Sequence, residues 1–102
     1  MPISSKQRAQ LRGMAMELDT IIQVGKGGIS DSLVESVNAA LKARELVKGR
    51  VLENSMLTAR EACDALCERG GAEGVQVIGT KFVMYKRNEK EPKIVLVKDK
   101  KK

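Results

Sequence analysis

Four consecutive residues, Gly25, Lys26, Gly27 and Gly28, carry the clearest chemical signal in the sequence. They follow a β-branched run that stops at Val24, and they stand just before a predicted helix. Glycine has no Cβ, so another backbone can approach it closely. A helix start offers free backbone N–H groups and a partial positive charge, and the lysine adds a full charge. The segment therefore predicts a loop that accepts a phosphate group.

The pattern of these residues narrows the kind of phosphate. A nucleotide-binding P-loop needs GxxxxGK[ST], and a dinucleotide fingerprint needs GxGxxG in a longer βαβ unit. Here the lysine precedes the last two glycines, and neither pattern matches. A GxxG with a basic residue inside is the form that a KH-type loop uses to clamp an RNA backbone. The alternative is a tight turn between strand and helix, which leaves the lysine unexplained.

The net charge of the chain favours a polyanionic partner. The chain has 102 residues, enough for one domain, with 19 Lys and Arg against 13 Asp and Glu. The excess lies at the two ends of the sequence: residues 1–29 carry +2, residues 30–80 carry −2 and residues 81–102 carry +6. Such asymmetry favours a polyanion-binding face. The alternative is a basic tail that only keeps the protein soluble.

The sequence argues against a metal site, export and a membrane span. It has no histidine, and Cys63 and Cys67 have helical spacing, so we expect small buried thiols and neither zinc nor a disulfide framework. No apolar run approaches the roughly 20 residues that span a bilayer. The N-terminus, MPISSKQRAQL, lacks the apolar core of a signal peptide. We therefore expect a cytoplasmic protein.

No constellation of residues suggests catalysis. The serines have no evident base, and no nucleophile–base pair or carboxylate dyad follows from spacing. We expect no catalytic residue, no cofactor and no small-molecule substrate. The acidic residues are predicted to lie on helix caps and exposed helix faces: Asp31, Glu35, Glu45, Glu53, Glu61, Asp64, Glu68 and Glu73.

Periodicity and turn residues predict the elements that position the loop. Ser4 or Ser5 caps the first helix. Ser30 or Ser32 caps the second, the latter with Glu35 as a capping box. TARE at 58–61 is another capping box. The predicted helices are 5–18, a second ending near 44, and a third that stops at Gly70–Gly71; the predicted strands are 20–24, 46–52, 75–78 and 81–86, with an optional strand at 93–97.

The order of these elements predicts the fold class. An α-β-α-β-α-β-β chain, with a hairpin turn at Gly79–Thr80, implies an α/β fold of the α+β two-layer type with a four-stranded mixed sheet. Residues 1–88 are predicted to form one domain. Residues 89–102 are predicted to be a charged tail, and its last residues, KDKKK, are expected to be disordered.

Further basic residues could extend an RNA-binding surface. Lys48 and Arg50 alternate to the strand face opposite Val47 and Val51. A solvated strand or helix face is the alternative for all of them. The other candidates are Lys6, Arg8 and Arg12 on the first helix and Lys86 and Arg87 after the last strand.

The two aromatic residues argue against base stacking on the sheet. Phe82 and Tyr85 are three apart on one predicted strand, so they point to opposite faces. A stacking platform needs several aromatics on one face. What remains is recognition of the backbone, with affinity that falls steeply with salt.

Several motifs in the same order resemble the CRM domain (chloroplast RNA splicing and ribosome maturation). The resemblance covers about residues 5–88 and is greatest to the stand-alone bacterial form, a small protein associated with assembly of the large ribosomal subunit. The motifs are IIQVGKGGIS with the amphipathic helix after it, LVKGRVLEN, TAREACDAL and GVQVIGTKFVMYKRN.

The resemblance implies both fold and function. The implied fold is akin to the C-terminal domain of translation initiation factor 3, and the implied RNA contact is the GxxG loop with neighbouring basic residues. We therefore expect a non-catalytic protein that binds pre-rRNA and large-subunit precursor particles and assists large-subunit assembly. Two alternatives stay open. One is a general single-stranded nucleic-acid binder. The other is an adaptor that docks a ribosomal protein on the acidic stripe Glu61, Asp64 and Glu68.

Overall fold

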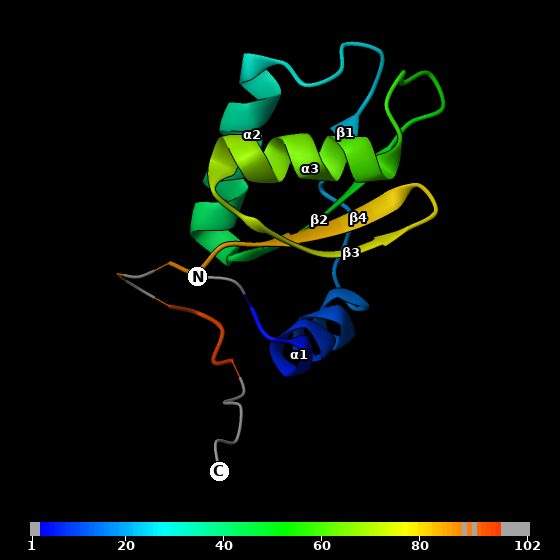
Figure 1. Cartoon of the computed structure of the whole chain (residues 1–102). Helices are drawn as coiled ribbons and strands as arrows, with labels where there is room; N and C mark the ends of the chain where they lie inside the picture. Colours follow the sequence, from blue (N-terminus) through cyan, green and yellow to red (C-terminus); the bar gives the residue numbers. More distant parts are fainter. Residues whose placement is uncertain (1–2, 89, 91, 97–102) are drawn as a thin grey trace.

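The computed structural model describes residues 3–88, 90 and 92–96. Within that part of the chain, helices and strands alternate in the predicted order, α-β-α-β-α-β-β (Figure 1). The elements are α1 Ser5–Ala15, β1 Ile22–Val24, α2 Asp31–Arg44, β2 Leu46–Val51, α3 Ala59–Gly70, β3 Glu73–Ile78 and β4 Lys81–Tyr85.

The four strands form one mixed sheet in the order β1-β2-β4-β3. β1 is parallel to β2, whereas β4 is antiparallel to both β2 and β3. The short strand β1 therefore lies at one edge of the sheet, and β3 lies at the other. This arrangement confirms the predicted fold class.

Helices cover both faces of the sheet because alternate strand residues are apolar on both. α2 and α3 pack on the face that carries Val47, Val51, Phe82 and Met84. α1 packs on the opposite face and adds a partial third layer to the predicted two. The cluster under α1 consists of Ile3, Leu11, Ala15, Leu46, Val75, Val83 and Tyr85. In Figure 1, α3 lies across the sheet, and α1 lies below the strands, near the bottom of the view.

The capping residues explain where the helices begin. Ser4 and Gln7 form a capping box on α1, and Thr58 and Glu61 form the predicted one on α3. α2 begins after Ser30, whose hydroxyl accepts the Leu33 N–H at 3.1 Å. The alternative of a box between Ser32 and Glu35 is therefore wrong.

The predicted end of α1 at residue 18 is also wrong. The helix stops at Ala15, and the Leu18 N–H donates to the Ala15 carbonyl at 3.0 Å in a tighter turn. The same carbonyl accepts a bond from the Lys48 Nζ of β2 at 3.3 Å. The helix C-terminus is thus closed by a lysine from the sheet, a partner that helix periodicity cannot reveal.

The strand bounds differ from the prediction by one or two residues. The glycines predicted at the end of α3 and in the hairpin turn have positive φ angles. Gly71 ends α3 with φ +66°, and Gly79 has φ +58° in the β3–β4 turn. Both values lie in the region that glycine adopts without the steric cost of a Cβ.

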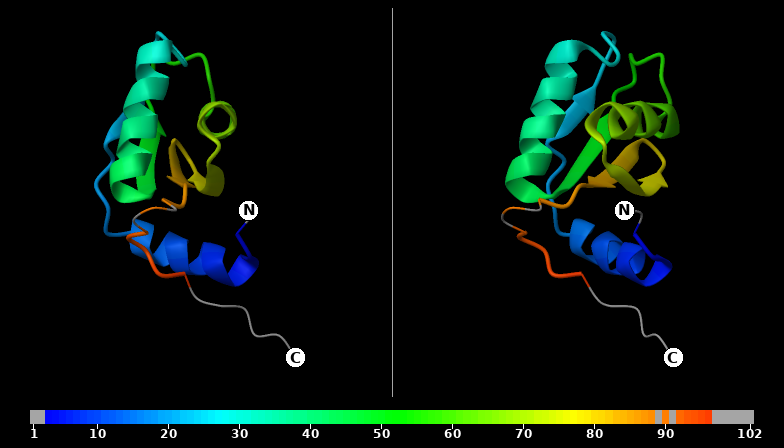
Figure 2. Two further views of the ribbon diagram at one scale, coloured as in Figure 1. Left: turned by 90° about the vertical axis from the view of Figure 1, so that its left-hand side faces the viewer. Right: turned by 60° about the vertical axis from the view of Figure 1, so that its left-hand side comes forward.

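The C-terminal segment lies along α1 rather than forming the optional strand. Residues 93–96 are not in a strand, whereas position 97 and the KDKKK prediction fall outside the described residues. Ile94 and Leu96 pack against the cluster under α1, and the Gln10 Nε2 donates to the Val95 carbonyl at 2.8 Å. Both views in Figure 2 show this segment passing beside α1.

A buried carboxylate fastens this segment to the body. Glu45 was predicted to lie on a helix cap or an exposed helix face; it is the C-cap of α2, with a φ of 66°, but it has no exposed surface. Its Oε1 accepts the N–H groups of Lys93 at 2.8 Å and Ile94 at 2.7 Å, and its Oε2 accepts the Asn88 N–H at 2.6 Å. Its burial was not predicted, and the three backbone donors explain how the charge is accommodated.

No helix among the described residues is long and apolar enough to cross a membrane.

Candidate nucleic-acid interface

The GxxG loop is a tight turn at the carboxyl end of β1. The Gly28 N–H donates to the Gly25 carbonyl at 3.0 Å and closes the turn. Lys26 and Gly27 form its exposed tip. The turn is anchored to the sheet because the Val24 carbonyl, just before it, accepts the Leu52 N–H at 2.8 Å.

The three glycines are not equally required by the fold. Gly28 has φ +68°, so a side chain there would strain the backbone. A Cβ on Gly25 would make ordinary contacts with Leu52 and Asn54, at 3.5 and 3.6 Å. Gly27 does not have a positive φ, and a Cβ there would meet nothing within 4 Å. The turn geometry thus accounts for Gly28 but explains neither Gly27 nor the exposed lysine beside it.

The backbone N–H groups of the loop differ in whether they are already hydrogen-bonded within the turn. The Gly28 N–H is used inside the turn, so it is not open to a ligand. The N–H groups of Lys26 and Gly27 donate to no residue in the described part of the chain. These two donors and the Lys26 ammonium are the groups that the loop can offer to an anion.

The start of α2 contributes less positive charge than the sequence suggested. Ser30 caps the helix with both its hydroxyl, which takes the Leu33 N–H, and its carbonyl, which takes the Val34 N–H. Asp31, in the first turn, adds a negative charge that favours the helix dipole and opposes an anion. Its carboxylate is paired with the Arg69 Nη2 at 2.9 Å, so a cation from α3 offsets this charge.

A row of exposed side chains crosses the sheet beside the loop. The strand registers place Gln23 next to Arg50, Arg50 opposite Lys81 and Lys81 opposite Ile78. Side chains at paired positions lie on the same face, and all four are exposed. α1 does not cover this end of that face. Arg50 is therefore exposed on the strand face opposite Val51, as its alternation predicted, and the register places Lys81 beside it.

Lys81 was absent from the sequence-based candidates. Because Lys81 follows the predicted turn at Gly79–Thr80, the sequence predicted that it begins a strand, but not which residue of β2 lies opposite it. The pairing with Arg50 depends on the register between β2 and β4, which are separated in the chain by α3 and β3. Nothing in the sequence specified that register.

The other predicted basic residues lie away from the loop. Lys48 is half-buried and bonded to the end of α1, a structural contact. Lys6 and Arg12 are exposed on α1, and the Arg8 Nη2 donates to the Gly74 carbonyl at 3.3 Å. Lys86 and Arg87 follow β4 near the C-terminal end of α2, whereas the loop precedes its N-terminal end. The candidate residues thus form separate groups.

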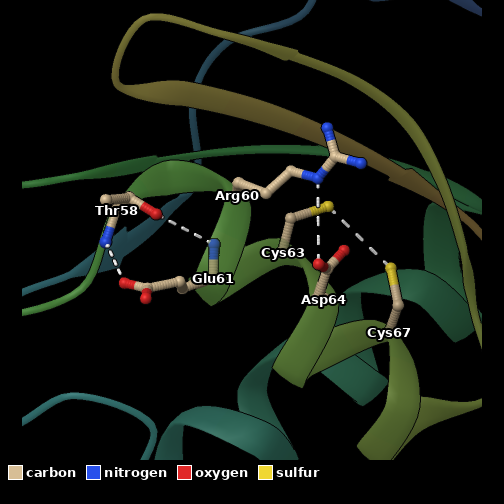
Figure 3. A network of polar contacts seen from close by, with 6 residues as sticks. All are labelled: Thr58, Arg60, Glu61, Cys63, Asp64 and Cys67. Carbon is tan, nitrogen blue, oxygen red and sulfur yellow. Dashed lines mark hydrogen bonds and ion pairs between the residues drawn. The ribbon is translucent and has the colours of Figure 1, made fainter.

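The acidic stripe on α3 is partly engaged within its own helix (Figure 3). The Glu61 Oε1 accepts the Thr58 N–H at 2.9 Å in the capping box. Asp64 lies 3.8 Å from the Arg60 Nε, in a pair so exposed that it contributes little to stability. Only Glu68 of the predicted docking stripe has no such contact among the described residues.

The two cysteines are free thiols, as expected. Cys63 is buried, Cys67 is half-buried, and their Sγ atoms are 4.0 Å apart (Figure 3). The hydrogen bond with Cys63 and burial raise the pKa of the Cys67 thiol, which favours its protonated form. The part of the chain that the structure describes has no group of three metal-ligating side chains.

Together, the fold and the exposed turn define a small α+β domain that presents a basic GxxG loop at the end of a parallel edge strand. The sequence matches the CRS1/YhbY (CRM) domain over residues 3–86. The chain belongs to this family, which confirms the resemblance inferred from its motifs.

Similar proteins carry RNA-related names. The chain is 37% identical to "Probable RNA-binding protein YqeI" of Bacillus subtilis, over 92% of this chain and 98% of that protein. It is 31% identical to an "RNA-binding protein" of Haemophilus influenzae, over 92% and 94%. Among solved structures it resembles the hypothetical protein SAV1595 of Staphylococcus aureus, described as a candidate RNA-binding protein. That match has a TM-score of 0.77 and 36% identity, over 93% of this chain and 99% of that one.

Proposed function

We propose that this protein is a non-catalytic RNA-binding protein that holds the backbone of pre-rRNA through its GxxG loop. Membership of the CRM family and the names of its relatives support RNA as the partner. The observation that carries the role of the loop is Gly27, which the fold does not require and which lies beside an exposed lysine.

The mechanism is a contact with phosphate. The bare tip at Gly27 lets a phosphodiester approach, and the N–H groups of Lys26 and Gly27 donate to its oxygens while the ammonium supplies charge. Arg50 and Lys81 continue the positive surface across the sheet. The only aromatic side chains in the chain, Phe82 and Tyr85, are buried, so they offer no stacking surface. Affinity therefore depends on phosphates and falls with salt.

Changing the tip of the loop tests this mechanism. Lys26→Glu should weaken binding to dodecauridylate about tenfold or more, because a charge-assisted hydrogen bond contributes roughly 1.5–3 kcal/mol. The slope of log affinity against log salt should fall by about 0.7 for every phosphate that the variant no longer neutralises. Gly27→Asp should act in the same direction. Fluorescence anisotropy between about 50 and 200 mM salt measures both quantities.

Arg60→Glu is the matched control, since it makes the same charge reversal on the exposed surface of α3. It should change affinity much less than Lys26→Glu. All three variants should keep the wild-type fold, because each site is exposed and no buried contact is altered. Unchanged affinity and salt slope in a folded Lys26→Glu protein would rule out the loop as the RNA contact.

The row on the sheet gives a second prediction. The double variant Arg50→Glu, Lys81→Glu should weaken dodecauridylate binding about tenfold. It reverses the charge of two basic side chains that lie opposite each other on β2 and β4. Combined with Lys26→Glu, the losses should add, since the side chains do not contact one another. Wild-type affinity in the double variant would show that RNA does not cross this part of the sheet.

The cellular role follows from the same resemblance. We place the protein in the cytoplasm, on precursors of the large ribosomal subunit, where it assists assembly. Crosslinking in cells identifies the bound RNA directly. Co-sedimentation with large-subunit precursors should be lost at high salt if phosphates hold the protein there. Persistence at high salt would instead favour docking on a ribosomal protein.

A further inference from the structure

A cavity of about 450 Å³ lies at the end of α2 opposite to the GxxG loop. One wall comes from the last turns of α2 and the other from the segment that follows β4. Its volume lies within the range of sites that bind small ligands. The lining residues are Asn38, Leu41, Lys42, Lys86, Arg87, Asn88 and Lys90.

The described lining of the cavity is basic. Among the described residues it includes four basic side chains, Lys42, Lys86, Arg87 and Lys90, and no acidic one. None of the four forms an ion pair with an acid in the described ranges. The carboxylate oxygens of Glu45, the acid that fastens this wall, accept backbone N–H groups and form no ion pair with these four side chains.

The end of a helix does not account for this charge. The C-terminal carbonyls of α2 carry only about half a negative charge. Two of them are already bonded: the Leu41 carbonyl accepts the Glu45 N–H at 2.7 Å, and the Lys42 carbonyl accepts the Asn88 Nδ2 at 3.1 Å. In the described part of the chain, no hydrogen bond joins these two carbonyls to the cationic side chains of the lining.

Hydrogen bonds hold the second wall in place. The Lys86 N–H donates to the Glu45 carbonyl at 2.9 Å, and the Asn88 N–H donates to the carboxylate of the same residue. The Asn88 Oδ1 accepts the Lys90 N–H at 3.1 Å. The backbone at Lys86, Asn88 and Lys90 is thus held by hydrogen bonds without a ligand, which reduces the entropic cost of binding.

The cavity and the loop are close enough to contact one RNA strand. α2 has 14 residues, so it separates them by about 21 Å at 1.5 Å per residue. A stacked strand advances roughly 3.4 Å per nucleotide. The separation therefore corresponds to about six nucleotides.

We propose that this cavity is a second RNA subsite, which holds the phosphate of an unpaired nucleotide on the strand that the GxxG loop holds. The proposal rests on the proposed RNA-binding function. The phosphate lies on Lys86, Arg87 and the neighbouring lysines, and the nucleotide enters the space above Leu41, the buried apolar residue of the lining.

The double variant Lys86→Gln, Arg87→Gln tests the subsite. It should weaken binding to dodecauridylate about tenfold and lower the salt slope by up to about 1.4, which corresponds to two phosphates at roughly 0.7 each. Uridine 5′-monophosphate should shift the amide resonances of Leu41 and of residues 86–88 in the wild type. Those shifts should vanish in the double variant and persist in Lys26→Glu.

Arg60→Glu is again the matched control, since it also lowers the net charge by two, outside the cavity. Both altered side chains are exposed; should the variant nevertheless misfold, Lys42→Gln, Lys90→Gln asks the same question. If Lys26→Glu weakens RNA binding and the folded cavity variants do not, the subsite is wrong and the proposed function stands. If neither weakens binding, the proposed function fails with it. An equal effect of Arg60→Glu also overturns the subsite.

Discussion

Replacing Gly49 with alanine should lower the free energy of unfolding by about 2–3 kcal/mol, because overpacking a well-filled core costs roughly that much. Gly49 lies in the middle of β2, beneath the ring of Phe82. An added Cβ would lie 2.6 Å from the Phe82 Cζ and 3.1 Å from the Ile22 Cβ. The ring is fully buried, so it could move away only by displacing neighbouring core side chains. Urea denaturation at constant m-value measures the loss.

Gly13→Ala is the control, since it makes the same chemical change in an open place. Gly13 is an exposed residue of α1, and a Cβ there would meet nothing within 4 Å. This variant should gain about 0.5–1 kcal/mol from helix propensity. Adding Phe82→Leu to Gly49→Ala should cost less than the sum of the single changes, because the smaller side chain makes room. Additive losses would contradict the proposed clash.

Glu45→Gln should lower the free energy of unfolding by about 2–4 kcal/mol, since buried charge-assisted hydrogen bonds are lost and a donor group is introduced among donors. The amide NH₂ of glutamine cannot accept the backbone N–H groups that the carboxylate oxygens now accept. The segment from Asn88 to Ile94 should therefore detach. Amide hydrogen exchange should show faster exchange at Ile94 while the strands keep their protection.

Glu35→Gln is the matched control for this change. Glu35 is exposed on α2, and surface substitutions of this kind usually stay within about 0.5 kcal/mol. Wild-type exchange rates at Ile94 in Glu45→Gln would show that the carboxylate does not hold the segment. Because the same segment forms a wall of the basic cavity, its release should also weaken the nucleotide shifts predicted there.

The features that could be predicted from sequence are those determined by neighbours in the chain. The capping box of Thr58 and Glu61 joins residues three apart, and the positive φ of Gly71 follows from the end of a helix. The GxxG turn is closed by a bond across three residues. The alternation of Arg50 against Val51 needs only the period of a strand. The motifs that indicated the family are likewise short continuous stretches of sequence.

The features that could not be predicted depend on contacts between distant residues. Glu45 looks like one more surface acid until the segment beyond Asn88 returns to it. Gly49 suggests a close approach, but its partner Phe82 is defined only by the register of β2 against β4. The same register brings Lys81 beside Arg50. In each case the decisive partner lies more than 30 residues away in sequence, beyond any local pattern.

The cluster under α1 has a consequence for the order of folding. It combines Ile3 and Leu11 with Val83 and, in part, Leu96, so the two ends of the chain complete one core. Contacts between residues so far apart in sequence form late, because a long loop must close first. During synthesis, α1 is made before its apolar partners: Leu46 of β2 comes next, but Val75, Val83 and Tyr85 of β3 and β4 follow only after α3. The first helix of this protein is therefore among the last elements to pack.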